Sequence, residues 1–197
     1  TSEDFKALKR EYSSLDVCKR IFTYYNADDL FEKINWHDGD VNDIPSLELG
    51  MKGCNLLLHC AGIVSFLPCD IERLKKVNIE GTANVMNVAL SSGINKAGFI
   101  SSIAALGRNS TVGLVDEESY FKATKTDSNY ALSKYFSEQE VWRASEEGLD
   151  VVIVNPSVIL GPGDWKKGSS QIFERIYKGL NFYTEGSSGY VDVSDVS

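Results

Sequence analysis

Three short apolar segments, each ending in small or polar residues, most constrain how this chain can fold. They read CNLLLHCAG (54–62), AGFISSIAALG (97–107) and DVVIVNPSVILGPG (150–163). Apolar runs of this length without polar alternation are typical of parallel strands that are buried on both faces. Amphipathic helical patterns lie between them, over 69–93 and 128–148. The alternation predicts an α/β fold, in which a parallel sheet is covered by helices on both faces.

The remaining segments continue this alternation within one predicted domain over residues 1–197. Further strands are expected over 4–10 and 34–40, and further helices over 13–34, 45–53 and 169–180, with a loop from 108 to about 126. Asn26 and the acidic residues after it could interrupt the helix over 13–34. Ser128 is a predicted N-cap, and Gly93 and Gly148 are predicted helix ends. The strand over 150–163 is expected to break at Asn155-Pro156.

Composition excludes several classes of protein. With 43% hydrophobic and 24% charged residues, the chain is typical of a soluble globular protein. The net charge is −8, no block of five like charges concentrates it, and basic residues are scattered, so no nucleic-acid partner is expected. Apolar runs fall far short of the ~20 residues of a membrane helix, and TSEDFKALKREYSS is not a signal peptide.

The cysteines and histidines indicate neither a metal site nor a disulfide framework. The four cysteines contain no CxxC pair, and there are two histidines, His37 and His59. Reduced thiols of this kind are typical of the cytoplasm, so a cytoplasmic protein without a metal is predicted.

Tyr130 and Lys134 are four residues apart in the predicted helix over 128–148. That spacing places both side chains on one face, one turn apart. A phenol has a pKa near 10, and a nearby ammonium would lower it and suit the phenol to exchange protons with an alcohol or ketone. Tyrosine and lysine also occur at this spacing by chance on many helices, so the pair alone does not establish a site.

Other segments place polar or small residues where parallel strands end, which is where such sheets bind ligands. Ser101 and Ser102 end a predicted strand and could hydrogen-bond a substrate carbonyl, or could simply cap the following loop. Asn78 and Gly81 are poor helix formers inside a predicted helix. Asp40 follows another strand, and its carboxylate could accept a hydrogen bond from an adenine amino group. Alternatively, Asp40 could have only a structural role in a turn.

Together these segments resemble a known family. HCAG, NIEGTAN, ISSIAALG, YALSK and NPSVILGPG occur in the order, and near the spacing, of the extended short-chain dehydrogenase/reductase family. Their detail is most similar to its dihydroflavonol-reductase-like and 3β-hydroxysteroid-dehydrogenase-like branch. The resemblance implies a Rossmann-type, doubly wound parallel sheet and an NAD(P)-dependent oxidoreductase. Such an enzyme transfers hydride between a nicotinamide and a carbonyl or alcohol carbon of a small molecule.

The resemblance also implies roles for particular residues. Tyr130 matches the catalytic acid/base, Lys134 the cation that binds the nicotinamide ribose and lowers the tyrosine pKa, and Ser102 the hydroxyl that polarises the substrate oxygen. Asn78 matches a supporting residue of the same site. The expected cofactor contacts are Asp40, Val41, Ala61, Gly62, Ile63, Pro156 and Val158. A homodimer is expected through the helix that carries Tyr130.

Cofactor preference is read from the end of the first strand. An acidic residue there binds a ribose 2′-hydroxyl, whereas arginine accommodates a 2′-phosphate. Lys9 and Arg10 precede Glu11, which favours NADP over NAD with Arg10 as the contact. The same charges could also be solvated at a strand end.

The sequence departs from the family pattern at both ends. It contains no Gly-rich turn of the GxxGxxG type, and it does not continue into the family's substrate region after residue 197. We therefore expect a Rossmann-type fold that is incomplete at both ends and a chain whose own activity is in question.

Two other functions stay open on the sequence. One is a nucleotide-sugar epimerase or dehydratase with tightly bound NAD, although Ile103 and Ala104 stand where dehydratases usually carry acidic residues. The other is a non-enzymatic cofactor-sensing protein on the same fold, although such members tend to lose the tyrosine or the lysine.

Overall fold

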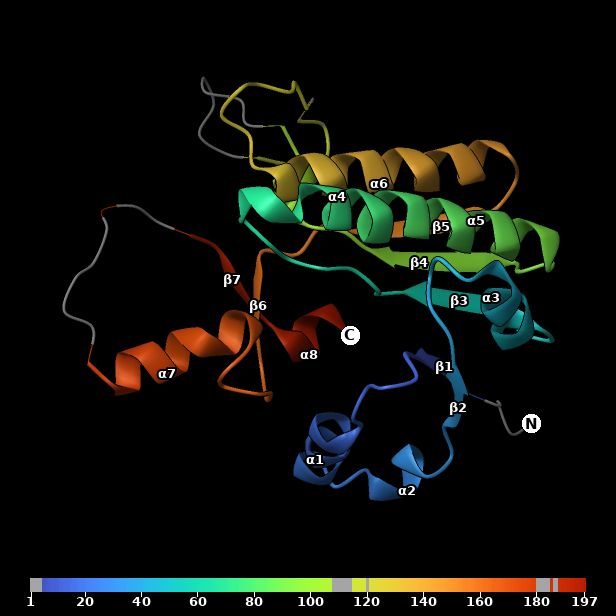
Figure 1. Cartoon of the computed structure of the whole chain (residues 1–197), viewed down its shortest axis with the longest axis horizontal. Coiled ribbons are helices and arrows are strands. Elements are labelled where there is room, and N and C mark those ends of the chain that lie inside the picture. The colour runs from blue at the N-terminus through green and yellow to red at the C-terminus, as the bar shows by residue number, and fades with distance from the viewer. Residues whose placement is uncertain (1–4, 108–114, 120, 180–184, 186–187) are drawn as a thin grey trace. The chain divides into compact units, whose positions relative to one another are not determined.

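The computed structural model describes residues 5–107, 115–119, 121–179, 185 and 188–197 (Figure 1). The chain divides into two compact units, Gly39–Pro156 and a second formed by Thr1–Asp38 with Ser157–Ser197. Part of the predicted loop, residues 108–114, lies outside the described residues. The prediction of one domain over residues 1–197 stays a prediction.

The Gly39–Pro156 unit is a three-stranded parallel sheet with helices. Its elements are α3 (Ile44–Met51), β3 (Leu56–His59), η1 (Pro68–Asp70), α4 (Ile71–Leu74), the π-helix η2 (Lys75–Glu80), α5 (Gly81–Ser91), β4 (Lys96–Ile100), η3 (Ile103–Ala105), α6 (Asn129–Glu146) and β5 (Asp150–Val154). The strand order is β3-β4-β5, and Phe99 pairs with His59 on one side and Ile153 on the other. The predicted parallel α/β class is confirmed.

The core of this unit lies between one face of the sheet and α5 and α6 (Figure 1). Ala97 and Phe99 of β4 point into it and are 0% and 1% exposed. Leu58 of β3 and Val152 of β5 are instead 70% and 51% exposed. Successive residues of a strand face opposite sides of the sheet. The prediction that these strands are buried on both faces is therefore wrong, because the helices of this unit gather on a single face.

The signals for helix ends are confirmed, and the helix predicted over 69–93 is present as a continuous helical segment whose type changes along its length. The Ser128 side chain caps α6 by accepting from Ala131 N at 3.1 Å, and Gly93 follows α5 with a φ of 73°. Between residues 68 and 91 the chain passes through η1, α4 and η2 before α5. A π-helix turn shifts the side chains that follow it around the helix axis, and such turns are frequent at functional sites.

The second unit contains two parallel strand pairs. Its elements are β1 (Lys6–Lys9), α1 (Asp16–Tyr24), α2 (Asp28–Phe31), β2 (Asn35–Asp38), β6 (Val158–Leu160), η4 (Gly168–Ser170), α7 (Gln171–Tyr177), β7 (Tyr190–Asp192) and α8 (Val193–Val196). β1 pairs with β2 and β6 with β7. The helix expected over 13–34 is divided at Asn26, whose φ of 53° is left-handed, a conformation that asparagine tolerates. The sequence pattern predicts neither β7 nor α8.

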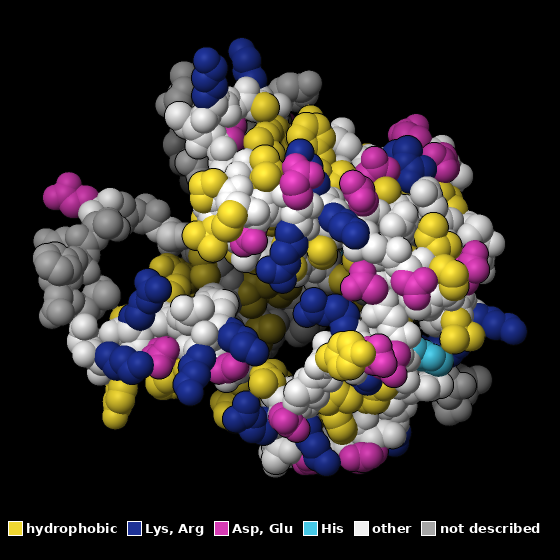
Figure 2. Space-filling view, in the orientation of Figure 1, with side chains coloured by type: hydrophobic (Ala, Val, Ile, Leu, Met, Phe, Trp, Pro, Cys, Tyr) yellow, Lys and Arg dark blue, Asp and Glu magenta, His cyan; other side chains and the backbone are white. Residues whose placement is uncertain are grey.

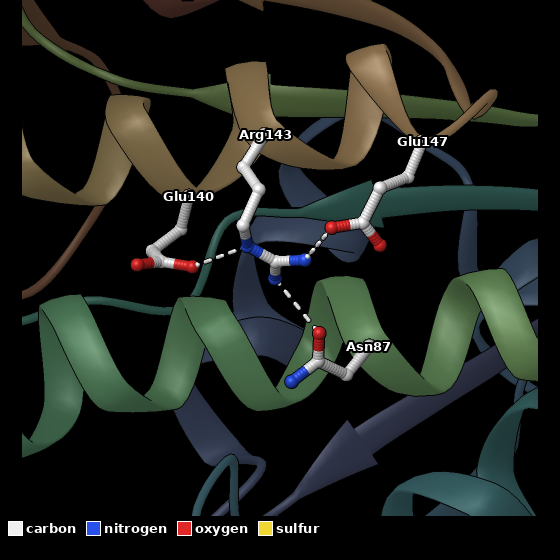
Figure 3. Close-up of polar contacts among 4 residues, drawn as sticks. All are labelled: Asn87, Glu140, Arg143 and Glu147. Atoms are coloured by element: carbon white, nitrogen blue, oxygen red, sulfur yellow. Dashed lines mark hydrogen bonds and ion pairs between the residues drawn. The ribbon is translucent and has the colours of Figure 1, made fainter.

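Arg143 of α6 links the two long helices of the first unit (Figure 3). Its guanidinium donates to Glu140 at 2.9 Å and Glu147 at 2.6 Å on its own helix, and to Asn87 Oδ1 on α5 at 2.7 Å. The hydrogen bonds to the two carboxylates raise the pKa of Arg143. The contacts are partly exposed, so they orient α5 against α6 more than they stabilise the fold.

Acidic and basic side chains are interspersed on the face of the molecule drawn in Figure 2. Within the described ranges, no helix combines the length and apolar character that a bilayer crossing requires. No cluster of three or more potential metal ligands occurs among these residues. All four cysteines are free thiols.

Candidate active site

α6 carries Tyr130 and Lys134 at the end of the sheet where β4 and β5 finish. Ser128 fixes the start of the helix, so Tyr130 lies in its first turn and Lys134 in the second. Lys134 is 6% exposed. The spacing predicted from the sequence therefore places a buried cation one turn beyond the phenol.

The Lys134 ammonium is held by β4. It donates to the Ile100 carbonyl oxygen at 3.0 Å and lies 4.4 Å from the centroid of the Phe99 ring. Burial lowers the pKa of Lys134 to about 8; the charge of Glu138, and secondly that of Cys60 when its thiol ionises, oppose that decrease. The side chain is thus charged at neutral pH but close to its titration range.

The Tyr130 phenol is half-buried beside Phe66, whose ring lies edge-on at 5.7 Å between centroids. Burial raises the pKa of Tyr130, and a side-chain hydrogen bond with Ser102 offsets part of that increase. The Lys134 ammonium itself is directed to Ile100 and Phe99. The expectation that it lowers the pKa of Tyr130 stays a prediction.

Ser102 occupies the turn between β4 and η3. Its Oγ accepts from Ala104 N at 3.1 Å, and the neighbouring Ile103 N donates to the Pro156 carbonyl at 3.1 Å. These bonds fix the turn that presents the Ser102 hydroxyl, which lies near enough to Tyr130 to influence its pKa. Ser101 is 5% exposed and its Oγ has no partner among the described residues, so Ser102 is the better placed of the two serines.

Asn78, in the π-helix η2, connects the loop after β3 to α6. It is 1% exposed, its Oδ1 accepts from Ile63 N at 2.8 Å, and its Nδ2 donates to Ile63 O at 3.0 Å. The same Nδ2 donates to Ser133 Oγ at 2.9 Å. Ser133 in turn donates to Tyr130 O at 2.8 Å. Asn78 therefore holds the loop after β3, which contains the expected cofactor contact Ile63, against the turn of α6 that bears Tyr130.

The expected cofactor contacts of this unit lie around that loop and after β2. Ala61 and Gly62 are exposed, and a Cβ on Gly62 would meet Asn78 Oδ1 at 3.4 Å, an ordinary contact. Asp40 Oδ1 accepts from Asn42 N at 2.9 Å in a turn. Val41 is 8% exposed, so its side chain is mainly a core residue.

The other expected contacts are engaged in different ways. The Pro156 carbonyl accepts from Ile103 N. Val158, in the second unit, donates its N–H to Gly189 O at 3.2 Å. Arg10, also in that unit, follows β1 and is exposed, whereas Lys9 before it pairs with Asp38. The assignment of these residues to cofactor contacts stays a prediction.

The sequence interpretation missed several buried polar residues next to the predicted ones. They are Ser133, Ser137 and Glu138 of α6 and His59 at the end of β3, together with the partly buried Asn155 after β5. Ser137 Oγ lies 2.7 Å from both Asn78 O and Ser133 O. The available signal was helical spacing, because Lys134–Glu138 and Ser133–Ser137 repeat the four-residue step of Tyr130–Lys134.

Comparison with known proteins identifies the family. Residues 8–190 match the 3-beta hydroxysteroid dehydrogenase/isomerase family. The chain belongs to this family. Its "Putative dihydroflavonol 4-reductase" relative from Synechocystis is 35% identical over 166 residues, which are 83% of this chain and 48% of that protein. The chain thus spans about half the length of the curated relatives it matches.

Solved structures agree with this membership in the 3-beta hydroxysteroid dehydrogenase/isomerase family. The crystal structure of gox2253 is 32% identical with a TM-score of 0.78, and the match covers 96% of this chain and 55% of that chain. A short-chain dehydrogenase/reductase superfamily protein from Agrobacterium tumefaciens with bound NAD is 25% identical with a TM-score of 0.58, covering 64% and 38%. The predicted Rossmann-type fold is confirmed.

The donor set of this family member fits a dinucleotide cofactor. An ammonium has three N–H donors, and among the described residues Lys134 uses one on Ile100 O. Two donors are left for hydroxyls such as those of a ribose. The exposed backbone at Ala61 and Gly62 allows a flat ligand to approach closely.

Proposed function

We propose that the protein reduces a ketone or aldehyde, or oxidises the corresponding alcohol, with NAD(P). The observation that carries the proposal is the placement of two groups on α6: Ile100 O holds the buried Lys134 ammonium at the end of β4, one helical turn beyond the half-buried Tyr130 phenol. The nicotinamide would supply the hydride. The chain's own residues would bind the reacting oxygen and move its proton.

In the direction of reduction, the Ser102 hydroxyl would hydrogen-bond the substrate oxygen and hold it beside the phenol. Tyr130 would donate its proton to that oxygen as negative charge develops there. The raised pKa of Tyr130 keeps the phenol protonated at neutral pH, which suits a proton donor. The Lys134 ammonium would stabilise the phenolate that results. Asn78 would support the site by fixing the loop that contains Ile63.

The proposed cofactor contacts are Asp40, Val41, Ala61, Gly62, Ile63, Pro156, Val158 and Arg10. We propose NADP as the preferred cofactor because Arg10 is exposed at the end of β1 and arginine at that position accommodates a 2′-phosphate, whereas Lys9 already pairs with Asp38. The ratio of kcat/KM for NADPH and NADH tests this preference. An Arg10→Gln variant should lose efficiency with NADPH and keep it with NADH.

The experiment that tests the reaction uses the full-length protein and a panel of ketones and aldehydes, with NADPH oxidation as the readout. A Tyr130→Phe variant should lower kcat by about 10²–10⁴-fold, the usual contribution of a general acid. Tyr135→Phe is the matched control, because Tyr135 stacks on Phe121 at 4.3 Å and keeps that contact. Undiminished turnover in Tyr130→Phe would exclude the proton-donor role.

A nucleotide-sugar epimerase with tightly bound NAD is the second candidate. The same three side chains serve that reaction, but Ile103 and Ala104 beside Ser102 offer no acid for a dehydration. NAD retained through purification, together with epimerisation of a sugar nucleotide and no net NADPH oxidation, would favour it. Neither activity in a protein that binds the cofactor would instead indicate a cofactor sensor.

We also propose a homodimer through α6 and a cytoplasmic location. Phe136 and Trp142 of α6 are 46% and 51% exposed, and an apolar cavity of about 100 Å³ lies between α4, η2 and α6. Light scattering that gives the monomer mass would exclude the dimer. The four free thiols fit a reducing compartment, which fractionation of cells that express a tagged full-length protein tests.

A further inference from the structure

Glu138 is a buried carboxylate that the proposed reaction does not yet use. It lies on α6, one turn beyond Lys134, and is 7% exposed. Glutamate is almost never this buried without a partner. Its neighbour on the helix, Glu140, is partly exposed and pairs with Arg143 instead (Figure 3). Surface water therefore cannot be what stabilises the Glu138 carboxylate.

One partner of Glu138 is Asn155, directly after β5. Asn155 Nδ2 donates to Glu138 Oε1 at 2.5 Å and to the Ser102 carbonyl oxygen at 3.1 Å. The amide thus joins the carboxylate on α6 to the turn that presents the Ser102 hydroxyl. Because Asn155 and Ser102 are 53 residues apart, this connection holds the ends of two different strands together.

Glu138 also acts on Lys134, through its charge. The two side chains are at i and i+4 on one helix, both are buried, and the Glu138 charge raises the pKa of Lys134 against the effect of burial. The other titratable groups that face Lys134 are Cys60, His59 and Tyr130. His59 is neutral at physiological pH because its pKa is lowered to about 4. Glu138 is thus the main negative charge that balances the ammonium.

We infer that Glu138 is a positioning residue: its carboxylate keeps the Lys134 ammonium charged and, through Asn155, holds the turn that presents Ser102. One side chain would then set both the charge beside the proton donor and the position of the substrate-binding hydroxyl. The consequence for catalysis rests on the proposed function. The effect of the Glu138 charge on Lys134 concerns this chain alone and can be tested without a substrate.

The first test removes the charge and keeps the hydrogen-bond acceptor. Glu138→Gln is compared with Glu140→Gln in the full-length protein, with the lysine side chains labelled with ¹³C at Cε and Lys134 assigned from a Lys134→Arg variant. The Lys134 resonance should titrate near pH 8 in the wild type. Loss of the nearby negative charge should move the midpoint down by about one pH unit in Glu138→Gln. Glu140→Gln should leave it in place.

The second test measures kcat/KM against pH, with NADPH and a carbonyl compound of the panel that the wild type reduces. In Glu138→Gln the basic limb of the kcat/KM profile should move to lower pH by the same amount as the Lys134 midpoint. At pH values below that limb, kcat/KM should be near normal. A merely structural role would lower activity at every pH and leave the limb where it is. If the wild type reduces no carbonyl, the proposed function fails, while the Lys134 titration still decides whether the Glu138 charge acts on Lys134.

An unchanged Lys134 midpoint in folded Glu138→Gln would overturn the inference. Should that variant fail to fold, the wild type supplies the answer. Its Lys134 resonance should show a small additional step on the acid side that coincides with titration of the Glu138 side-chain carboxyl carbon. A flat Lys134 resonance across that titration would likewise overturn the inference.

Discussion

The Lys134 ammonium lies over the ring of Phe99, 4.4 Å from its centroid. The Phe99 ring also stacks on His59 at 5.4 Å between ring centroids. A cation on the face of an aromatic ring gains electrostatic stabilisation, most of all where water is excluded. Phe99 is 1% exposed, so the core of the sheet contributes directly to holding the cation of the candidate site.

A double-mutant cycle on this pair should show coupling. We expect an interaction free energy of about 1–2 kcal/mol between Lys134→Met and Phe99→Leu, measured by urea unfolding of the full-length protein. Each single variant loses the interaction, so the double variant should be less destabilised than the sum of the singles. Strictly additive losses would show that the ring contact contributes nothing.

His59 should make stability depend on pH. Burial, and secondly the charge of Lys134, lower its pKa from 6.5 to about 4. The unfolded chain therefore binds the proton more tightly, and stability is complete above pH 6.5 and is lost as the pH falls towards 4. The loss should approach about 3 kcal/mol.

A His59→Gln variant tests this dependence, because an amide can still hydrogen-bond Thr82, which lies 3.0 Å from His59 Nε2. Urea unfolding at pH 7, 6 and 5 should show a weaker decrease in stability for the variant than for the wild type. Parallel decreases would assign the acid sensitivity to other groups.

Asn78→Ala should destabilise the protein by about 2–4 kcal/mol, since it removes the hydrogen bonds of a fully buried amide to Ile63 N, Ile63 O and Ser133 Oγ. Hydrogen exchange at Ile63 should accelerate. The control is Asn84→Ala, which removes a single, longer bond of 3.2 Å to Val41 O and should cost about 1 kcal/mol. Equal costs would show that the Asn78 network has no special weight.

Gly81→Ala should destabilise although alanine favours helices. Its Cβ would lie 2.5 Å from Val41 Cγ2, and overpacking of this kind costs about 1–3 kcal/mol, more than the gain in helix propensity of about 1 kcal/mol. Glycine at position 81 therefore accommodates the close approach of Val41. Val41→Ala should relieve the clash, so the double variant should unfold at higher urea than Gly81→Ala alone. A lower midpoint for the double variant would contradict the clash.

Local patterns were sufficient for several features of this protein. The apolar segments predicted parallel strands, Ser128 predicted the start of α6, and the four-residue step predicted that Tyr130 and Lys134 share a face. Each of these follows from backbone geometry over a few residues, so the tertiary structure could only confirm it. The motif order likewise predicted the family that the comparisons identified.

Other features depended on contacts between distant segments. Which strand faces are buried depended on where the helices lie, so Leu58 is exposed although its segment reads as a buried strand.

By itself, then, the sequence determined the class of fold, the family and the pair Tyr130–Lys134, because local spacing and motif order encode them. Only the tertiary structure decided what surrounds the pair. It directs the Lys134 ammonium to Ile100 and Phe99, and it brings Asn155 to Glu138. Those contacts arise from strand register and helix packing, which no local pattern specifies.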